Sequence, residues 1–218
     1  TGALHLGHAY AAKVAHEFAV RSGGKMILRI DDIDHTRCRD EFIPPILRNL
    51  AWLGLNWHGV KPNDFTNPRN TNQNVSRQSH RKAQYQAALK TLDDLGLIYP
   101  CYLSRRELNE VLSAPHALPS PQVKKDQLSQ RVTINTDQLL SSSEQELRRA
   151  AGRGPAWRLR MNAALKMVQQ MNPNPLSWFD HITGHQVAKP EEFGDVVIAR
   201  ADIAVSYHLS VVVDDALD

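Results

Sequence analysis

Thr1-Gly2-Ala3-Leu4-His5-Leu6-Gly7-His8 opens the chain, and apolar residues at helical spacing continue from there to Arg21. Gly23 and Gly24 end this predicted helix, since glycine is common just past a helix end. Lys25–Ile30 is then predicted to be a buried strand, and the acidic stretch Asp31-Asp32-Ile33-Asp34 follows it. A helix, a strand and an acidic loop in this order are typical of an α/β sheet fold.

The remaining elements are predicted from apolar spacing and from turn residues. Residues 80–95 form the clearest amphipathic helix, with Tyr85 on its apolar face. Residues 40–53 are predicted to be a helix with Pro44-Pro45 in its first turn, where proline is tolerated. Ser104 is a candidate N-cap with capping-box spacing. The other expected elements are short helices over 105–112 and 143–151, strands over 98–102, 157–161, 195–199 and 207–213, a hairpin over 178–187, and loops over 55–80 and 115–154.

Composition places few limits on function. The chain has 218 residues, 42% of them hydrophobic, and a formal net charge of +3. This mild basicity permits nucleic-acid binding without demanding it. Cys38 and Cys101 are the only cysteines, which predicts no disulfide framework and fits a reducing, cytoplasmic compartment. No apolar run approaches the roughly 20 residues of a membrane span, so we expect no membrane association, and nothing demands more than a monomer.

His5 and His8 flank Gly7 at the predicted helix start. Unpaired backbone N–H groups and the helix dipole favour phosphate there, and the glycine lets a nucleotide approach the backbone closely. Imidazole N–H groups add donors of the kind that stabilise charge developing on phosphorus oxygens. The pattern therefore indicates a nucleotide site. Two incidental histidines near a helix cap are the alternative.

The stretch Arg29–Arg37 carries three acids and two arginines directly after the predicted strand. Open α/β sheets place their ligands at the carboxyl ends of strands. Acids at this position are suited to hold an ammonium group. A solvated surface loop with salt bridges is the alternative.

Together, these segments resemble the catalytic domain of class I glutamyl-tRNA synthetases and of their shorter relatives, the glutamyl-Q tRNA(Asp) synthetases. Thr1–His8 resembles the class I nucleotide-binding signature, and Leu28–Arg37 resembles the family's Arg-Ile-Glu-Asp-x-Asp-x-x-Arg stretch. The resemblance is weak over residues 61–79 and 113–154. The other similar segments follow in the family's order and are Leu95–Tyr102, Trp178–Gly184, Gly194–Arg200 and Ser206–Asp215.

The resemblance implies that His5, Gly7 and His8 contact ATP, with His5 and His8 as the catalytic pair. Asp31 stands where the family has an acid that binds the amino group of glutamate. That acid is usually Glu, which is one methylene longer. Tyr207 corresponds to the family's substrate-binding tyrosine, and a core tyrosine in an apolar strand is its alternative.

The implied reaction has two steps. The carboxylate of L-glutamate attacks the α-phosphorus of ATP and expels pyrophosphate, and an acceptor hydroxyl then attacks the acyl adenylate. Mg²⁺ is expected with ATP because it neutralises phosphate charge, and no covalent enzyme nucleophile is required. Asp214 and Asp215 correspond to the family's paired acids after a core strand, and their alternative role is to end that strand.

The resemblance also implies a Rossmann-like class I aminoacyl-tRNA synthetase catalytic domain with an inserted α/β subdomain similar to an acceptor-binding domain. We expect residues 1–100 to form the first part of the catalytic domain, 101–190 the insertion and 191–218 the return to the catalytic sheet. The chain is expected to be a fragment, truncated at both ends. The arginine-bearing strand before Thr1 and the Lys-x-Ser-Lys-type loop after Asp218 lie outside it, so the fragment alone is expected to activate glutamate weakly or not at all.

Zinc is not expected. Relatives often bind it through a Cys-x-Cys pair and a later Tyr and Cys, whereas here Leu103 stands two residues after Cys101 and no later cysteine follows. A single thiol does not complete a four-ligand structural site.

Within the family, the acceptor is open. Ser206–Leu209 and the compact first half up to Cys101 favour the glutamyl-Q type, which attaches glutamate to queuosine in the anticodon of tRNA(Asp). The alternative is an enzyme that charges the terminal ribose of tRNA(Glu). A non-catalytic tRNA-binding paralogue is a further alternative, since a fold does not guarantee a function.

Overall fold

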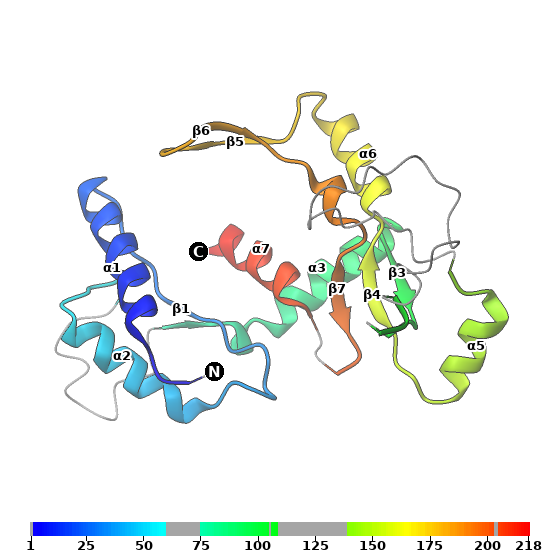
Figure 1. Ribbon diagram of the computed structural model, residues 1–218, viewed down its shortest axis with the longest axis horizontal. Helices are drawn as coiled ribbons and strands as arrows, with labels where there is room; N and C mark the ends of the chain where they lie inside the picture. The colour runs from blue at the N-terminus through cyan, green and yellow to red at the C-terminus, as the bar shows by residue number, and fades with distance from the viewer. Residues whose placement is uncertain (1, 60–74, 105, 109–138, 203–204) are drawn as a thin grey trace. The chain divides into compact units, whose positions relative to one another are not determined.

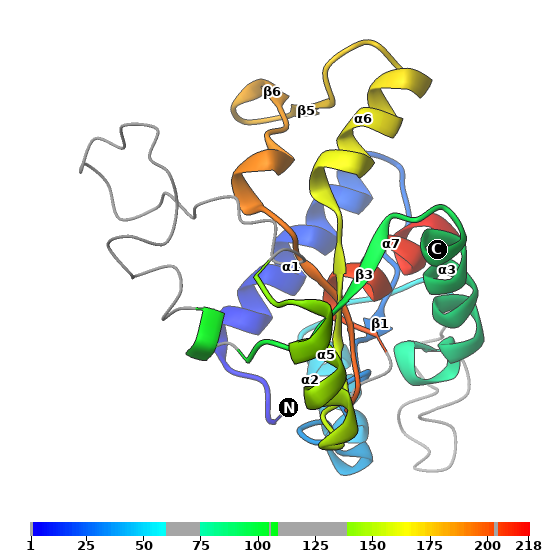
Figure 2. The ribbon, with the colours of Figure 1, turned by 90° about the vertical axis from the view of Figure 1, so that its right-hand side faces the viewer.

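The computed structural model of the protein describes residues 2–59, 75–104, 106–108, 139–202 and 205–218. The chain forms two compact units. The first comprises Thr1–Tyr85 and Ser210–Asp218, and the second comprises Gln86–Leu209. Their elements are shown from two directions in Figures 1 and 2.

In its described residues, the first unit consists of helices and one pair of short parallel strands. Strand β1 (Arg29–Ile30) pairs in parallel with β2 (Ser76–Arg77). The other elements of this unit are α1 (Leu6–Arg21), the 3-10 helix η1 (Asp40–Phe42), α2 (Ile43–Trp52), the 3-10 helix η3 (Gln78–His80), the start of α3 (Lys82–Asp94) and the greater part of α7 (Tyr207–Leu217).

Helix α2 supplies the hydrophobic core of the first unit. Ile43, Leu47 and Leu50 recur at helical spacing and are buried, and Leu47 is completely inaccessible. Leu55 and Trp57 complete the buried cluster. Because each such side chain contributes about 1.5–3 kcal/mol when it leaves water, this helix is a principal source of stability for the unit that carries the candidate site.

The second unit contains a three-stranded antiparallel sheet in the order β3-β4-β7. The strands are β3 (Ile98–Cys101), β4 (Ala156–Leu159) and β7 (Val197–Arg200). The chain between them forms α5 (Ser142–Ala150), α6 (Met161–Met171), the hairpin of β5 (Ser177–Asp180) and β6 (Gly184–Val187), and the 3-10 helix η5 (Pro190–Phe193).

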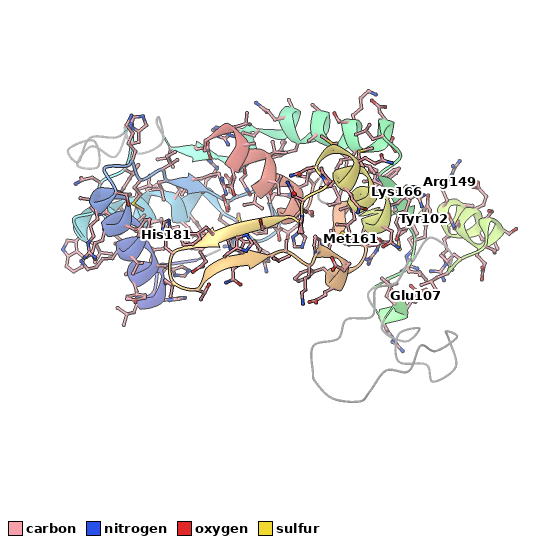
Figure 3. All side chains as sticks on the ribbon, turned by 90° about the horizontal axis from the view of Figure 1, so that it is seen from above. Tyr102, Glu107, Arg149, Met161, Lys166 and His181 are labelled. Atoms are coloured by element: carbon pink, nitrogen blue, oxygen red, sulfur yellow. The ribbon has the colours of Figure 1, made fainter. Side chains whose placement is uncertain are left out.

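A buried carboxylate connects this sheet with α6. Asp195 accepts a hydrogen bond from the Tyr99 hydroxyl at 2.7 Å. Its other oxygen accepts the backbone N–H of Met161 at 2.9 Å, at the start of α6 (Figure 3). One acid therefore satisfies a buried hydroxyl and an otherwise unpaired helix N-terminus.

The predicted capping role of Ser104 is confirmed. Its hydroxyl accepts the N–H of Glu107 at 3.2 Å, and Glu107 accepts the N–H of Ser104 at 2.7 Å. Glu107, labelled in Figure 3, also accepts a hydrogen bond from Arg148 of α5 at 2.6 Å. The hydrogen bonds from Ser104, joined by that from Arg148, hold the pKa of Glu107 at about 2.

The strand predicted over residues 207–213 is wrong, because these residues begin helix α7. Three consecutive valines favour a strand locally, but tertiary packing overrides this preference. Ser210 and Asp214 are both buried, and their spacing of four places them on one helix face. The Ser206 hydroxyl accepts a backbone N–H of the first turn at 3.5 Å, as an N-cap does. Asp214 and Asp215 therefore belong to a helix rather than to a strand end.

Most other predicted elements are confirmed. Helices α1, α2, α3 and α5 match their predicted ranges, with Pro44-Pro45 in the first turn of α2. Strands β3 and β4 and the β5–β6 hairpin also lie where expected. The strand predicted over residues 25–30 is too long, since only Arg29–Ile30 pair.

The loop predicted over residues 55–80 is wrong at its end, where β2 and η3 form. Parts of the predicted loops at 55–80 and 115–154, and most of the short helix at 105–112, lie outside the described residues. Among the helices that are described, none is both long and apolar enough to cross a membrane.

We expect Leu47→Ala to lower the free energy of unfolding by about 2–5 kcal/mol, the usual cost of truncating a fully buried leucine. Trp52→Ala is the matched control, because Trp52 lies on the same helix and is 85% exposed. Exposed substitutions of this kind usually change stability by no more than about 0.5 kcal/mol. Urea unfolding measures both variants, and equal losses would contradict the role of α2 in the core.

Candidate functional site

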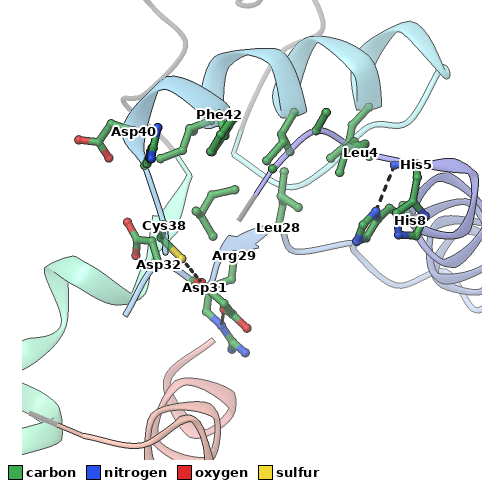
Figure 4. Close-up of a pocket in the computed structure, with 18 of the residues that line it drawn as sticks. Leu4, His5, His8, Leu28, Arg29, Asp31, Asp32, Cys38, Asp40 and Phe42 are labelled. Atoms are coloured by element: carbon green, nitrogen blue, oxygen red, sulfur yellow. Dashed lines mark hydrogen bonds and ion pairs between the residues drawn. The ribbon is translucent and has the colours of Figure 1, made fainter. Parts of the chain in front are cut away.

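A cavity of about 720 Å³ opens in the first unit beside β1 and the start of α1. His5, His8 and Asp31 all line it, although Asp31 is distant from the two histidines in the sequence. Figure 4 shows the imidazoles on one side and Asp31 with Arg29 on another, with Leu28 between them. The volume lies in the range of small-molecule sites. Three of the side chains expected to bind substrates therefore share one cavity.

The two histidines cap their own helix. Nδ1 of His5 accepts the N–H of Gly7 at 3.1 Å, and Nδ1 of His8 accepts the N–H of His5 at 3.2 Å. The ring centroids lie 3.9 Å apart. A ring nitrogen that accepts a hydrogen bond carries no proton, so the neutral imidazole bears its N–H at Nε2. Each ring thus keeps one donor, which is the group that a phosphate oxygen requires.

Gly7, which was expected to contact ATP, is not among the residues that line the cavity, but its lack of a side chain matters locally. A Cβ atom at this position would lie 3.0 Å from Cε1 of His5 and 3.2 Å from its Nδ1. The glycine therefore leaves room for the imidazole that caps α1. Because the Gly7 N–H is already bonded to that ring, the imidazole Nε2 atoms are better placed than this amide to supply donors.

Asp31 follows β1 and is one of the residues that line the cavity. Its Oδ1 accepts a hydrogen bond from Nε of Arg29 at 2.8 Å, and 35% of the side chain is exposed. Over the described part of the chain, no hydrogen-bond donor is seen on its Oδ2. One oxygen therefore remains to accept a hydrogen bond from an ammonium group.

Asp32, the next residue, is saturated by protein donors. Arg77 donates to it from Nε at 2.8 Å and from Nη2 at 2.6 Å, and Ser79 donates from its N–H and its hydroxyl at 2.8 Å each. Burial alone would raise the pKa of Asp32, but these hydrogen bonds outweigh burial and lower it. Asp31 and Asp32 both line the cavity, but it is Asp32 that fastens the acidic loop to β2 and η3.

Another carboxylate, that of Asp214 in α7, is completely buried and lies 3.5 Å from Nε of Arg29. It accepts hydrogen bonds from Gln78 at 2.8 Å, Arg81 at 3.0 Å and the Tyr85 hydroxyl at 2.7 Å. Burial raises the pKa of Tyr85, and the adjacent carboxylate raises it further. The sequence indicated Tyr85 only as an apolar helix position, and Gln78 and Arg81 were missed. Their one readable signal is that Arg81 and Tyr85 are four residues apart on one helical face.

Tyr207 is the first residue of α7 and belongs to the second unit. Its side chain is 58% exposed, so the alternative of a buried core tyrosine is wrong. Within the described ranges, no group of three or more His, Cys, Asp or Glu side chains is arranged to hold a metal ion.

Comparison with known sequences finds similarity over the whole chain. A sequence model described as "tRNA synthetases class I (E and Q), catalytic domain" matches residues 1–218. A glutamyl-Q tRNA(Asp) synthetase of Rhodobacter capsulatus is 35% identical, covering 99% of this chain and 69% of the relative. One of Symbiobacterium thermophilum is 36% identical, covering 100% and 60%. A glutamate–tRNA ligase of a Synechococcus species is 35% identical, covering 99% and 38%.

Comparison with solved structures shows a shared fold. Crystal structures of glutamate tRNA ligases from Elizabethkingia meningosepticum and Elizabethkingia anophelis each superpose with a TM-score of 0.63, at 22% and 23% identity. Each match covers 99% of this chain and 40% of the ligase. The chain therefore spans only part of the length of these proteins.

We expect Asp32→Asn to lower the melting temperature at neutral pH, because the neutral amide loses the charge that Arg77 neutralises. The pKa of Asp32 lies below its ordinary value of 3.8. Its stabilising contribution is therefore complete above that value and is lost as the pH falls through the folded pKa. The difference in melting temperature between wild type and variant should become smaller below about pH 4.

Asp40→Asn is the matched control, because Asp40 contacts the same guanidinium but its side chain is 82% exposed. It should lower the melting temperature little at any pH. Thermal unfolding from pH 2 to pH 7 tests both variants. A gap for Asp32→Asn that stays constant with pH would contradict the assignment.

Proposed function

The chain belongs to the catalytic-domain family of class I tRNA synthetases for glutamate and glutamine, and from this premise we propose that the protein activates L-glutamate with ATP and transfers it to queuosine in the anticodon of tRNA(Asp). The observation that carries the proposal is one cavity lined by the imidazoles of His5 and His8 and by the carboxylate of Asp31. This combination offers donors for phosphate and an acceptor for an ammonium group.

ATP is proposed to place its phosphates at the start of α1. There the Nε2 donors of His5 and His8 and the positive end of the helix dipole meet negative charge. Such donors stabilise the transition state more than the bound substrate, because charge on the phosphorus oxygens is redistributed as the α-phosphorus is attacked. Mg²⁺ is proposed to enter with ATP, bound mainly by phosphate and water oxygens.

L-glutamate is proposed to bind with its ammonium group on Oδ2 of Asp31. Tyr207 remains a proposed glutamate contact through its family position. A carboxylate oxygen of glutamate then forms a bond to the α-phosphorus, and the bond between that phosphorus and the bridging oxygen breaks to release pyrophosphate. An acceptor hydroxyl attacks the carbonyl carbon of the adenylate, its proton is lost, and AMP leaves. The protein positions the reactants and stabilises charge throughout.

The acceptor is the least constrained part of the proposal. Relatives called glutamyl-Q tRNA(Asp) synthetase support queuosine as the acceptor, at 35% and 36% identity. A relative called glutamate–tRNA ligase, also at 35% identity, supports the alternative of charging tRNA(Glu). The two alternatives share the first step and differ only in the hydroxyl that attacks the adenylate.

Pyrophosphate exchange tests the first step in the full-length protein, and transfer of labelled glutamate to tRNA tests the second. We expect glutamate-dependent exchange between ATP and labelled pyrophosphate without any tRNA, followed by transfer of labelled glutamate to tRNA(Asp) that carries queuosine. The same tRNA(Asp) without queuosine is the control and should accept no label. Exchange that requires tRNA(Glu) would favour the charging enzyme, and no exchange at all would favour a non-catalytic paralogue.

His5→Ala and His8→Ala are each expected to slow exchange about a hundredfold, the usual effect of removing one donor to a developing negative charge. His16→Ala is the control, because His16 lies on the same helix but is absent from the cavity lining. Circular dichroism must show that α1 remains folded in all three variants. Exchange that is equally slow in the His16 variant would rule out a specific role for the pair.

A further inference from the structure

Arg29 has an unusual set of partners in the first unit. Its guanidinium contacts the carboxylates of Asp31, Asp214, Asp215 and Asp218. Three of these acids lie at the end of the chain, whereas Asp31 lines the histidine cavity. Only 15% of the Arg29 side chain is exposed. The guanidinium therefore links the substrate-facing acid to a fixed point elsewhere in the same unit.

We propose that Arg29 is a positioning residue, which holds the Asp31 carboxylate so that its second oxygen is presented to the ammonium group of the amino-acid substrate. This inference rests on the proposed function, because it assigns the orientation of the acid that binds glutamate. Arg29 acts through Asp31 and is not itself a catalytic residue.

The hydrogen bond between Arg29 and Asp31 restricts the orientation of the acid. Nε of Arg29 donates to Oδ1 of Asp31 at 2.8 Å. A charged hydrogen bond of this length restricts rotation of a short carboxylate side chain. With Oδ1 committed, a change of the Asp31 side-chain rotamer breaks the bond. An aspartate without this partner would sample several rotamers, and ordering one of them would cost part of the binding free energy.

Other atoms of the guanidinium are held by acids at the end of α7 and just after it. Nη1 of Arg29 donates to Asp215 at 2.8 Å and to Asp218 at 3.2 Å. Nε also lies 3.5 Å from the buried Asp214. Because the guanidinium is planar and rigid, fixing Nη1 fixes the direction of Nε as well. Asp215 and Asp218 thereby determine where Asp31 is held.

The net charge of the cluster around Arg29 determines whether Asp31 still attracts a cation. A cation beside Asp31 would weaken its attraction for ammonium if nothing offset it. Here the four carboxylates face two guanidinium groups, those of Arg29 and Arg81. Burial by itself would lower the pKa of Arg29, but the hydrogen bonds that Arg29 donates to these acids raise it above its ordinary value. The cluster therefore stays negative overall, and a substrate cation is still attracted.

Arg81 offers a matched control for a purely structural role. Arg81 contacts Asp214 at 3.0 Å and also Asp218, so it shares two acids with Arg29. Its side chain is 18% exposed, close to the value for Arg29. Arg81 makes no contact with Asp31 among the described interactions. Loss of either arginine removes a buried cation from the same acids, but only one loss releases Asp31.

The test compares Arg29→Gln and Arg81→Gln in the full-length protein by glutamate-dependent pyrophosphate exchange. We expect both to lower the melting temperature by similar amounts. Arg29→Gln should raise the KM for glutamate about tenfold and leave the KM for ATP within about twofold, as expected for one lost charged hydrogen bond. Arg81→Gln should leave both KM values within about twofold of wild type.

A double variant separates positioning from a direct charge effect. If Arg29 acts through Asp31, Arg29→Gln should add little to the loss caused by Asp31→Asn, so the two effects are far from additive. Arg29→Lys serves if Arg29→Gln does not fold. The lysine ammonium group keeps a positive charge among the acids. It lacks the rigid, forked donors that let arginine hold Asp31 and the acids near the end of α7 at fixed angles, so KM for glutamate should still rise.

The outcomes are distinguishable. Equal KM changes in the Arg29 and Arg81 variants, additive losses with Asp31→Asn, or a normal KM for glutamate in Arg29→Lys would each overturn the positioning role while the proposed function stands. Absence of glutamate-dependent exchange in the wild type would overturn the proposed function, and the inference with it.

Discussion

The carboxylate of Asp214 is the constraint on which the first unit depends. A fully buried charge is tolerated only when several donors surround it, because leaving water is costly. Its donors come from separate parts of the chain, namely Gln78 in η3, and Arg81 and Tyr85 at and within the start of α3. Satisfying one ion therefore requires α7, η3 and α3 to meet at one point.

This constraint reaches the candidate site through arginine. Arg29 lies 3.5 Å from Asp214 and donates to Asp31 at 2.8 Å. Arg77 performs the corresponding task for Asp32 from β2. Each of these two adjacent acids is thus paired with its own arginine, and Asp32 accepts more hydrogen bonds from the protein than Asp31 does. Substitution of Arg29 and substitution of Arg77 are therefore expected to affect the loop differently, since Arg29 contacts Asp31, the acid with an oxygen left for a ligand, and Arg77 contacts Asp32.

The histidine pair is organised by a shorter-range device. Each ring accepts a backbone N–H near the start of α1, and the absence of a side chain at Gly7 leaves room for His5. The same contacts that cap the helix determine which ring nitrogen carries the proton. Helix capping and the presentation of donors are therefore one arrangement, and the segment Gly2–His8 contains all the residues that it needs.

Local patterns in the sequence determined the helices over α1, α2 and α3, the strands β3 and β4, and the histidine motif, because spacing and capping act over a few residues. The three valines before Asp214 predicted a strand, and only tertiary packing made them helical. The pairing of Arg29 with Asp215 spans 186 positions and leaves no local signal. The sequence by itself thus supplied the chemical groups, whereas the tertiary structure decided which acids are buried and which arginine each acid pairs with, because burial and charge pairing depend on segments that are distant in the chain.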